Sequence, residues 1–85
     1  MTDAVTIEVL LFSTLRERVG RGMLKMSLPV PATGAVLLDQ LIAEYPSVKD
    51  YRPVIRLAVN ASYSSTETLL QTGDEVALIT PVSGG

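Results

Sequence analysis

Apolar and polar residues alternate near the start of the chain, and this period of two predicts a β-strand at Val5–Phe12. One face of the strand is apolar throughout, and we assign it to the core. The other face begins with polar residues and becomes apolar at Leu10 and Phe12. Exposed apolar side chains on a small domain indicate a binding surface, unless a local loop covers them. The residues expected on the core face are Val5, Ile7, Val9 and Leu11.

A short helical turn and a second strand are predicted next. Ser13 is a suitable N-cap for a turn at Thr14–Val19, and Gly20 can end it, because glycine readily adopts the left-handed conformation found after helices. Alternation resumes at Met23–Leu28, which predicts a strand in a hairpin-like relation to the first. Its expected core residues are Leu24, Met26 and Leu28.

The most regular helical pattern spans Ala35–Tyr45. Its apolar residues recur at the three- and four-residue spacing of an amphipathic helix. They are Leu38, Leu41, Ile42 and Tyr45. Thr33 is the expected N-cap, and Pro46 closes the helix because a proline ring disrupts helical hydrogen bonding. We interpret the polar residues Lys49–Pro53 as a connection.

Two more strands are predicted in the second half of the chain. Ile55–Val59 alternates and runs into an asparagine turn, and Val76–Thr80 is rich in residues that favour strands. Between them, a polar stretch precedes Leu69–Leu70, which we expect to return to the core. Pro81 ends the last strand because it has no N–H to donate to a sheet.

The order of these elements predicts an α+β domain. It reads strand, strand, helix, strand, then a short strand or turn, and a last strand. A mixed β-sheet with one main helix across one face satisfies this order. The alternation pattern alone leaves other α+β sheets open.

The chain ends with Gly84–Gly85, and the five residues after the last strand can reach roughly 15–18 Å from the domain when extended. One interpretation of this ending is an ordinary frayed terminus. The other is that the terminal carboxylate is itself a substrate. Two residues without a Cβ can enter a channel that is too narrow for other side chains.

Composition narrows the possible functions. The chain has 85 residues, enough for one domain with one core, and it contains neither cysteine nor histidine. These absences argue against a self-sufficient hydrolase or metalloenzyme, and any sulfur chemistry at this chain would need sulfur supplied from outside. The net charge of −2 argues against nucleic-acid binding. We recognise no signal peptide or membrane-spanning stretch, and we expect a soluble cytoplasmic protein.

Charge is distributed unevenly along the chain. Four basic residues lie between Arg16 and Lys25, whereas no lysine or arginine follows Arg56. The acidic last third is either ordinary solvated surface or a means of steering the chain end toward a basic site on a partner.

Segments at both ends of the chain resemble one known family, the small subunits of molybdopterin synthase, which are ubiquitin-like sulfur carriers. The similar segments follow the family's order and cover somewhat under half of the chain. They are Phe12–Glu17 with Gly20, then Ala58–Asn60, Gly73–Ala77 and Pro81–Gly85. Arg21–Ile55 matches only in outline, and Thr80 stands where the family often has a proline.

The resemblance implies a β-grasp fold in which the first and last strands are neighbours in the middle of the sheet. Residues 1–80 then form the β-grasp domain, and residues 81–85 form a flexible diglycine tail. It also implies that an adenylating enzyme of the ubiquitin-activating type joins the carboxylate of Gly85 to AMP. A sulfur donor protein then converts Gly85 to a thiocarboxylate. The chain itself binds no cofactor, because AMP and sulfur are only carried covalently at Gly85.

The acceptor implied by the resemblance is the large subunit of molybdopterin synthase, whose pocket acts on a pterin precursor. This chain is then a non-catalytic, sulfur-donating subunit of a transferase complex, with no nucleic acid or membrane as partner. Gly84 gives clearance, and Pro81–Ser83 hold the tail in register. The residues expected to contact partners are Leu10, Phe12, Ile79, Pro81, Val82, Ser83 and Gly84.

Three other functions stay open at this point. A sulfur carrier for thiazole or cysteine synthesis shares the same terminal chemistry. A protein modifier would instead join Gly85 to a lysine through an isopeptide bond. A plain β-grasp binding module would carry an inert tail, and its activity would survive deletion of Gly84–Gly85.

Overall fold

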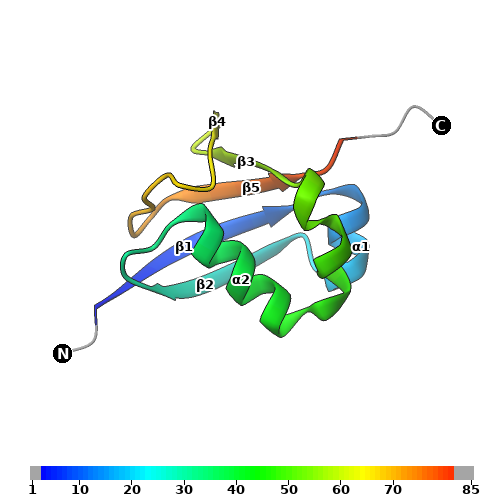
Figure 1. Ribbon diagram of the computed structural model, residues 1–85, viewed down its shortest axis with the longest axis horizontal. Helices are drawn as coiled ribbons and strands as arrows, with labels where there is room; N and C mark the ends of the chain where they lie inside the picture. Colours follow the sequence, from blue (N-terminus) through cyan, green and yellow to red (C-terminus); the bar gives the residue numbers. More distant parts are fainter. Residues whose placement is uncertain (1–2, 82–85) are drawn as a thin grey trace.

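Five strands pair into one mixed sheet in the order β2-β1-β5-β3-β4 (Figure 1). The computed structural model describes residues 3–81. β1 and β5 are parallel neighbours, and the β1–β2, β3–β5 and β3–β4 pairs are antiparallel. The predicted adjacency of the first and last strands is therefore confirmed. The strands are β1 (Ala4–Leu11), β2 (Met23–Pro29), β3 (Arg56–Val59), β4 (Ser62–Ser64) and β5 (Glu75–Ile79).

Three helical segments connect the strands, namely α1 (Ser13–Val19), α2 (Gly34–Glu44) and the 3₁₀ helix η1 (Pro46–Val54). Figure 1 shows α2 crossing one face of the sheet, with α1 and η1 near the end where β1 and β5 finish. The other face carries no helix within residues 3–81, and we call it the open face. In this part of the chain, no helix has the length and apolar character needed to cross a bilayer.

The core forms where the apolar face of the sheet meets α2. In β1 and β2, the expected core residues are buried, and the residues between them are exposed or half-buried. From α2, Leu37, Leu38 and Leu41 are at most 1% exposed. Ile42 and Tyr45 are only partly buried against this core. Because full burial of a leucine side chain contributes about 1.5–3 kcal/mol, this layer accounts for much of the stability of the domain.

The ends of the two α-helices confirm two predicted caps. The Thr33 hydroxyl accepts a hydrogen bond from the backbone N–H of Val36 at 3.2 Å, which satisfies one free donor at the start of α2. Gly20 has a φ of +87° after α1, and its N–H donates to the Arg16 carbonyl at 2.8 Å. Only a residue that tolerates positive φ closes a helix in this way without strain.

Two predictions about helices are wrong. The N-cap of α1 is Phe12 rather than Ser13, because Phe12 is extended and its carbonyl accepts from Leu15 N–H at 3.1 Å. No side chain caps this helix. The segment Lys49–Pro53 is not a plain connection, because it lies inside η1. Val48 is fully buried and fixes η1 against the core.

The prediction that Leu69 returns to the core is wrong. Its side chain is 65% exposed, whereas Leu70 beside it is 4% exposed. Leu69 forms an isolated bridge with Thr33, and neighbouring residues of an extended segment point to opposite sides, so only one of the two leucines can face inward. The other predicted strand ends differ from the structure by a residue: β1 ends at Leu11, and β5 is Glu75–Ile79.

Gly34 allows a close backbone contact at the start of α2. A Cβ at this position would lie 2.6 Å from Cδ1 of Leu57 and 3.0 Å from the Cα of Thr66. The backbone N–H of Ala35 donates to the Thr66 carbonyl at 2.9 Å. The loop that precedes β5 therefore packs directly on α2, and a side chain at position 34 would separate them.

Candidate functional site

The candidate site begins with the turn that starts β5. Asp74 accepts hydrogen bonds from the backbone N–H of Gln71 at 2.8 Å and from Nδ2 of Asn60 at 2.9 Å. Oδ1 of Asn60 accepts from the N–H of Glu75 at 3.0 Å. Asn60 lies in the β3–β4 turn with a φ of 49°, a conformation that asparagine tolerates better than most residues. These bonds join the two turns and fix where β5 begins.

β5 is paired on both sides, with β1 in parallel and with β3 in antiparallel orientation. Val76 and Leu78 are 0% exposed on its inner face, and Ile79 is half-buried on the open face. A strand held at both edges is a rigid support. The chain therefore leaves the sheet at a fixed point after Ile79, and Pro81 is exposed beyond it.

Three of the predicted contact residues share the open face next to this exit. Leu10 is half-buried and lies opposite Ala77, and Leu11 lies opposite Leu78. Continuing this parallel register brings Phe12, which is extended and 47% exposed, level with Ile79. Alternation places Phe12 on the same face as Leu10. The strand register thus places Leu10, Phe12 and Ile79 near one another on the open face, and their role in binding a partner stays a prediction.

An apolar row crosses all five strands on the open face. The strand registers place its members opposite one another, in the order Met23, Leu10, Ala77, Ala58 and Tyr63. Met23 is 51% exposed and Tyr63 is 75% exposed, so both ends of the row are available to a partner. Of this open-face row, only Leu10 was predicted from the sequence as a contact residue. The alternation of β2 already indicates Met23, whereas Tyr63 requires the β3–β4 register.

Charged residues flank the open-face row differently on its two sides. Away from the tail, Glu8 lies opposite Lys25 on β2 and opposite Glu75 on β5. Toward the tail, Arg56 lies opposite Ile79 and has no acidic residue across from it. The side of the row nearest the chain end therefore combines an apolar surface with one positive charge.

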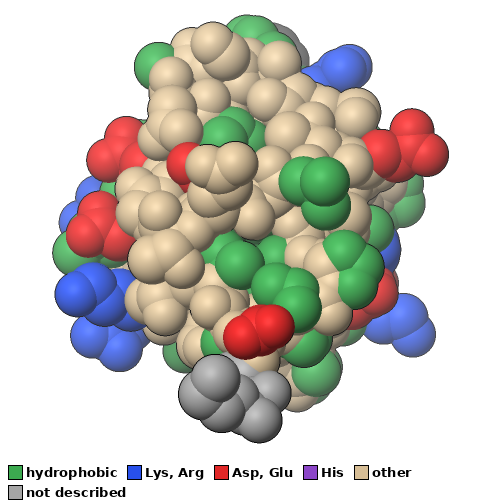
Figure 2. All heavy atoms as spheres, turned by 90° about the vertical axis from the view of Figure 1, so that its left-hand side faces the viewer, with side chains coloured by type: hydrophobic (Ala, Val, Ile, Leu, Met, Phe, Trp, Pro, Cys, Tyr) green, Lys and Arg blue, Asp and Glu red, His purple; other side chains and the backbone are tan. Residues whose placement is uncertain are grey.

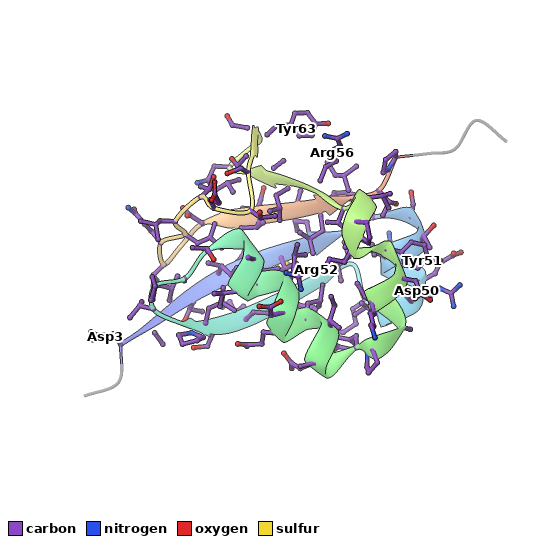
Figure 3. The ribbon with its side chains drawn as sticks, viewed as in Figure 1. Asp3, Asp50, Tyr51, Arg52, Arg56 and Tyr63 are labelled. Atoms are coloured by element: carbon purple, nitrogen blue, oxygen red, sulfur yellow. The ribbon has the colours of Figure 1, made fainter. Side chains whose placement is uncertain are left out.

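A groove lies beside the exit of the chain, and we call it the exit groove. It has a volume of about 560 Å³. Its apolar wall consists of Ile55, Leu57, Ile79 and Pro81. Its polar wall consists of Arg56, Tyr63 and the hydroxyl-bearing residues 64–66. Figure 3 shows Arg56 and Tyr63 projecting from the β3–β4 edge of the sheet, away from α2.

A second exposed apolar group lies away from the exit. Val30 and Leu69 are 48% and 65% exposed. Val30 follows Pro29, which pairs with Ala4 at the start of β1, and Leu69 forms a bridge with Thr33, three residues after Val30. Figure 2 views this end of the molecule and shows hydrophobic side chains gathered there. Since β1 and β5 are parallel, the start of β1 is far from the end of β5. This group is not part of the candidate site.

The reacting end of the predicted site is not among the described residues. Val82, Ser83, Gly84 and Gly85 all lie outside them, and the roles assigned to these residues stay predictions. Within residues 3–81, no group of three or more acidic side chains is arranged to hold a metal ion. What the described part offers is a fixed exit for the chain and an exposed apolar surface around it.

Three comparisons identify similar proteins. The ThiS family model matches residues 9–85. A molybdopterin synthase sulfur carrier subunit from Arabidopsis thaliana is 38% identical over 84 residues, which cover 99% of this chain and 88% of the relative. The small archaeal modifier protein 1 of Methanosarcina acetivorans is 28% identical, with a TM-score of 0.80 over 98% of this chain and 99% of that one.

A more distant structural neighbour comes from Helicobacter pylori, in a complex of subunits 1 and 2 of molybdopterin-converting factor. It is 23% identical, with a TM-score of 0.63 over 95% of this chain and 100% of that one, and it supports the fold alone. Together with the strand order, these likenesses confirm the predicted β-grasp fold. Because the family model covers most of the chain and the Arabidopsis relative aligns over nearly all of it, the chain belongs to the ThiS family.

Proposed function

We propose that this chain is a sulfur carrier subunit of molybdopterin synthase and that the carboxylate of Gly85 carries the sulfur. The observation that supports this most directly is the position of β5. This strand is paired on both sides and runs straight into the C-terminal segment, beside the exposed apolar residues Leu10, Phe12 and Ile79. A domain built in this way presents its chain end to another protein without changing its own fold.

The proposed chemistry uses the chain end alone. An oxygen of the Gly85 carboxylate attacks the α-phosphorus of ATP on an adenylating enzyme, which releases pyrophosphate and leaves an anhydride with AMP. A hydrosulfide ion delivered by a donor protein then attacks the carbonyl carbon of Gly85. The bond from that carbon to the bridging oxygen breaks, AMP departs with the oxygen, and a thiocarboxylate remains. Activation makes an unreactive carboxylate susceptible to nucleophilic attack. Since this chain has no cysteine or histidine, acid–base work falls to its partners.

The large synthase subunit is the proposed acceptor of the loaded tail. The name of the Arabidopsis relative describes a subunit, and the Helicobacter neighbour was solved in a complex of two subunits. In our proposal, Leu10, Phe12 and Ile79 pack against the large subunit while residues 81–85 enter its pocket. Two such transfers supply the dithiolene sulfurs. Because activation consumes ATP, the proposed place of action is the cytoplasm.

ATP–pyrophosphate exchange with the adenylating enzyme tests this proposal. The wild-type chain should stimulate exchange, and a variant that lacks Gly84–Gly85 should not, although its thermal unfolding stays the same. A variant with one alanine added after Gly85 should also fail, because its terminal carboxylate is displaced and carries a Cβ. Equal exchange by the wild-type and truncated chains would refute the proposed role of Gly85.

A second candidate function is covalent protein modification, which the likeness to the Methanosarcina modifier protein favours. A modifier also needs an activated terminal glycine, but the acyl group is transferred to a lysine amine. The two functions differ in their products. Immunoblots of a native lysate should show this chain only at its own mass if it is a carrier, and ligated products at higher mass if it is a modifier.

A further inference from the structure

Arg56 is a cation without a counter-charge in the described part of the chain. Within residues 3–81, the recorded salt bridge joins Arg52 to Asp39, and no hydrogen bond is recorded for the Arg56 guanidinium. Its cross-strand neighbour on β5 is Ile79. Lys25, at the other end of the open face, differs because Glu8 lies directly opposite it. Arg56 therefore holds a positive charge over an apolar surface, and no acidic residue lies opposite it.

Tyr63 stands beside Arg56 on the same face. Tyr63 lies opposite Ala58, and Arg56 precedes Ala58 by two residues on β3, so Arg56 is the diagonal neighbour of Tyr63. Diagonal neighbours are roughly 7–8 Å apart, within reach of long and aromatic side chains. Both line the exit groove, and Tyr63 is 75% exposed. Tyrosine and arginine are enriched at the residues that contribute most to protein–protein binding.

The position of the exit groove limits what Arg56 can bind. Pro81 lines the same groove, and four extended residues from Pro81 reach roughly 13–14 Å to Gly85. A phosphate that reacts with the Gly85 carboxylate is therefore far from Arg56 when the tail is extended into a pocket. The surface that meets Arg56 is the protein surface around the mouth of that pocket. A guanidinium recognises a carboxylate there through two parallel hydrogen bonds.

We propose that Arg56 binds an aspartate or glutamate at the mouth of the large subunit's pocket, while Tyr63 packs on an apolar side chain beside that acid. This inference rests on the proposed function and adds a specificity-determining contact to it. Stable interfaces bury about 1,200–2,000 Å² in total, which a five-residue tail cannot supply. The exit groove is continuous with the open-face row through Tyr63, which belongs to both, so the same partner can cover both.

Titration calorimetry with the purified large subunit tests whether the positive charge of Arg56 contributes to binding. Arg56→Glu should weaken binding roughly 100-fold, because the partner carboxylate then meets a like charge. Arg56→Gln should weaken it roughly tenfold, because the carboxylate only loses its counter-ion. Lys49→Glu is the matched control, because it makes the same change in charge at an exposed position of η1, away from the open face. It should bind within twofold of the wild type. Arg56→Lys should fall between wild type and Arg56→Gln, since lysine keeps the charge but not the paired hydrogen bonds.

A charge-swap experiment tests the chemistry of the partner. Single Asp→Lys and Glu→Lys changes on the large subunit are combined with Arg56→Glu. At least one should restore affinity to within about threefold of the wild-type pair. The Tyr63→Ser variant should also bind more weakly, while its amide NMR spectrum shows an intact fold. If no swap restores binding, the carboxylate partner does not exist and the inference is wrong.

The outcomes separate this inference from the proposed function. If wild-type chain binds the large subunit but Arg56→Glu binds equally well, only the role of Arg56 is refuted. The same holds if Lys49→Glu weakens binding as much. It also holds if Arg56→Glu abolishes adenylation and leaves large-subunit binding intact, because the contact then belongs to the activating enzyme. If wild-type chain does not bind the large subunit at all, both the proposed function and this inference fail.

Discussion

Asn60 and Asp74 hold together two turns that are 14 residues apart in the chain, with Nδ2 of Asn60 donating to Oδ1 of Asp74 at 2.9 Å. Each side chain also accepts a hydrogen bond from a backbone N–H: Asp74 from Gln71 in the turn before β5, and Asn60 from Glu75, the first residue of β5. The pair fixes the start of the strand whose other end releases the tail. Because a one-residue slip would turn every side chain of β5 to the opposite face, this start determines which residues surround the exit.

Replacing Asp74 with alanine should reduce the free energy of unfolding by about 1–3 kcal/mol, since the Asn60 amide and the Gln71 N–H both lose their acceptor. Urea unfolding monitored by circular dichroism measures the change. Glu67→Ala serves as the control, because Glu67 is an exposed acidic residue in a nearby loop. An unchanged unfolding midpoint for Asp74→Ala would show that the pair does not hold the turns.

Gly34→Ala should destabilise the domain by about 1–3 kcal/mol, because the new methyl group overlaps Leu57 and meets the backbone of Thr66. Gly22→Ala is the matched substitution. Its Cβ has only an ordinary contact of 3.4 Å, with Nε of Arg16, so it should change stability little. Thermal unfolding should give a lower midpoint for Gly34→Ala than for Gly22→Ala. Equal midpoints would contradict the close packing at Gly34.

Phe12→Asp should weaken binding to the large subunit about tenfold or more while the fold survives. Phe12 is the N-cap of α1, where aspartate is a favourable residue, so loss of the ring should not unfold the helix. Val30→Asp is the control, since Val30 is 48% exposed and Phe12 is 47% exposed. Calorimetry should show weaker binding for Phe12→Asp and unchanged binding for Val30→Asp. Equal losses for both variants would remove Phe12 from the docking surface.

Removing the Thr33 hydroxyl should lower stability by about 1 kcal/mol, because the Val36 N–H at the start of α2 loses its partner. Thr33→Ser keeps the hydroxyl and should retain most of the stability, whereas Thr33→Ala should not. Hydrogen exchange of the first turn of α2 should be faster in Thr33→Ala. Identical exchange in the two variants would mean that the cap contributes nothing.

Short-range patterns predicted much of this fold. The period of two in β1 and β2 identified buried residues correctly, and the stripe that contains Leu38 and Leu41 identified α2. These patterns follow from the geometry of one element and need no knowledge of its neighbours. The η1 helix was missed because a polar 3₁₀ helix has no such period and Val48 is its only buried residue.

The surface around the exit depends on strand pairing, which the sequence does not show directly. Leu10, Phe12 and Ile79 could be proposed from the sequence because each is an apolar residue near the end of an alternating segment. Arg56 and Tyr63 could not, because only the β3–β4 and β3–β5 registers bring them to one groove. Likewise, Leu69 was misplaced because its single bridge to Thr33 decides which of two adjacent leucines faces inward.

Intact-mass spectrometry of the chain purified from its native cell can detect sulfur bound at Gly85. If Gly85 carries sulfur, a fraction of the chain should have a mass increased by the replacement of one oxygen with sulfur. Fragmentation should locate the sulfur at Gly85, and depletion of the sulfur donor or of ATP should remove it. A chain that carries only its unmodified carboxylate under conditions of active cofactor synthesis would contradict the proposed role of Gly85.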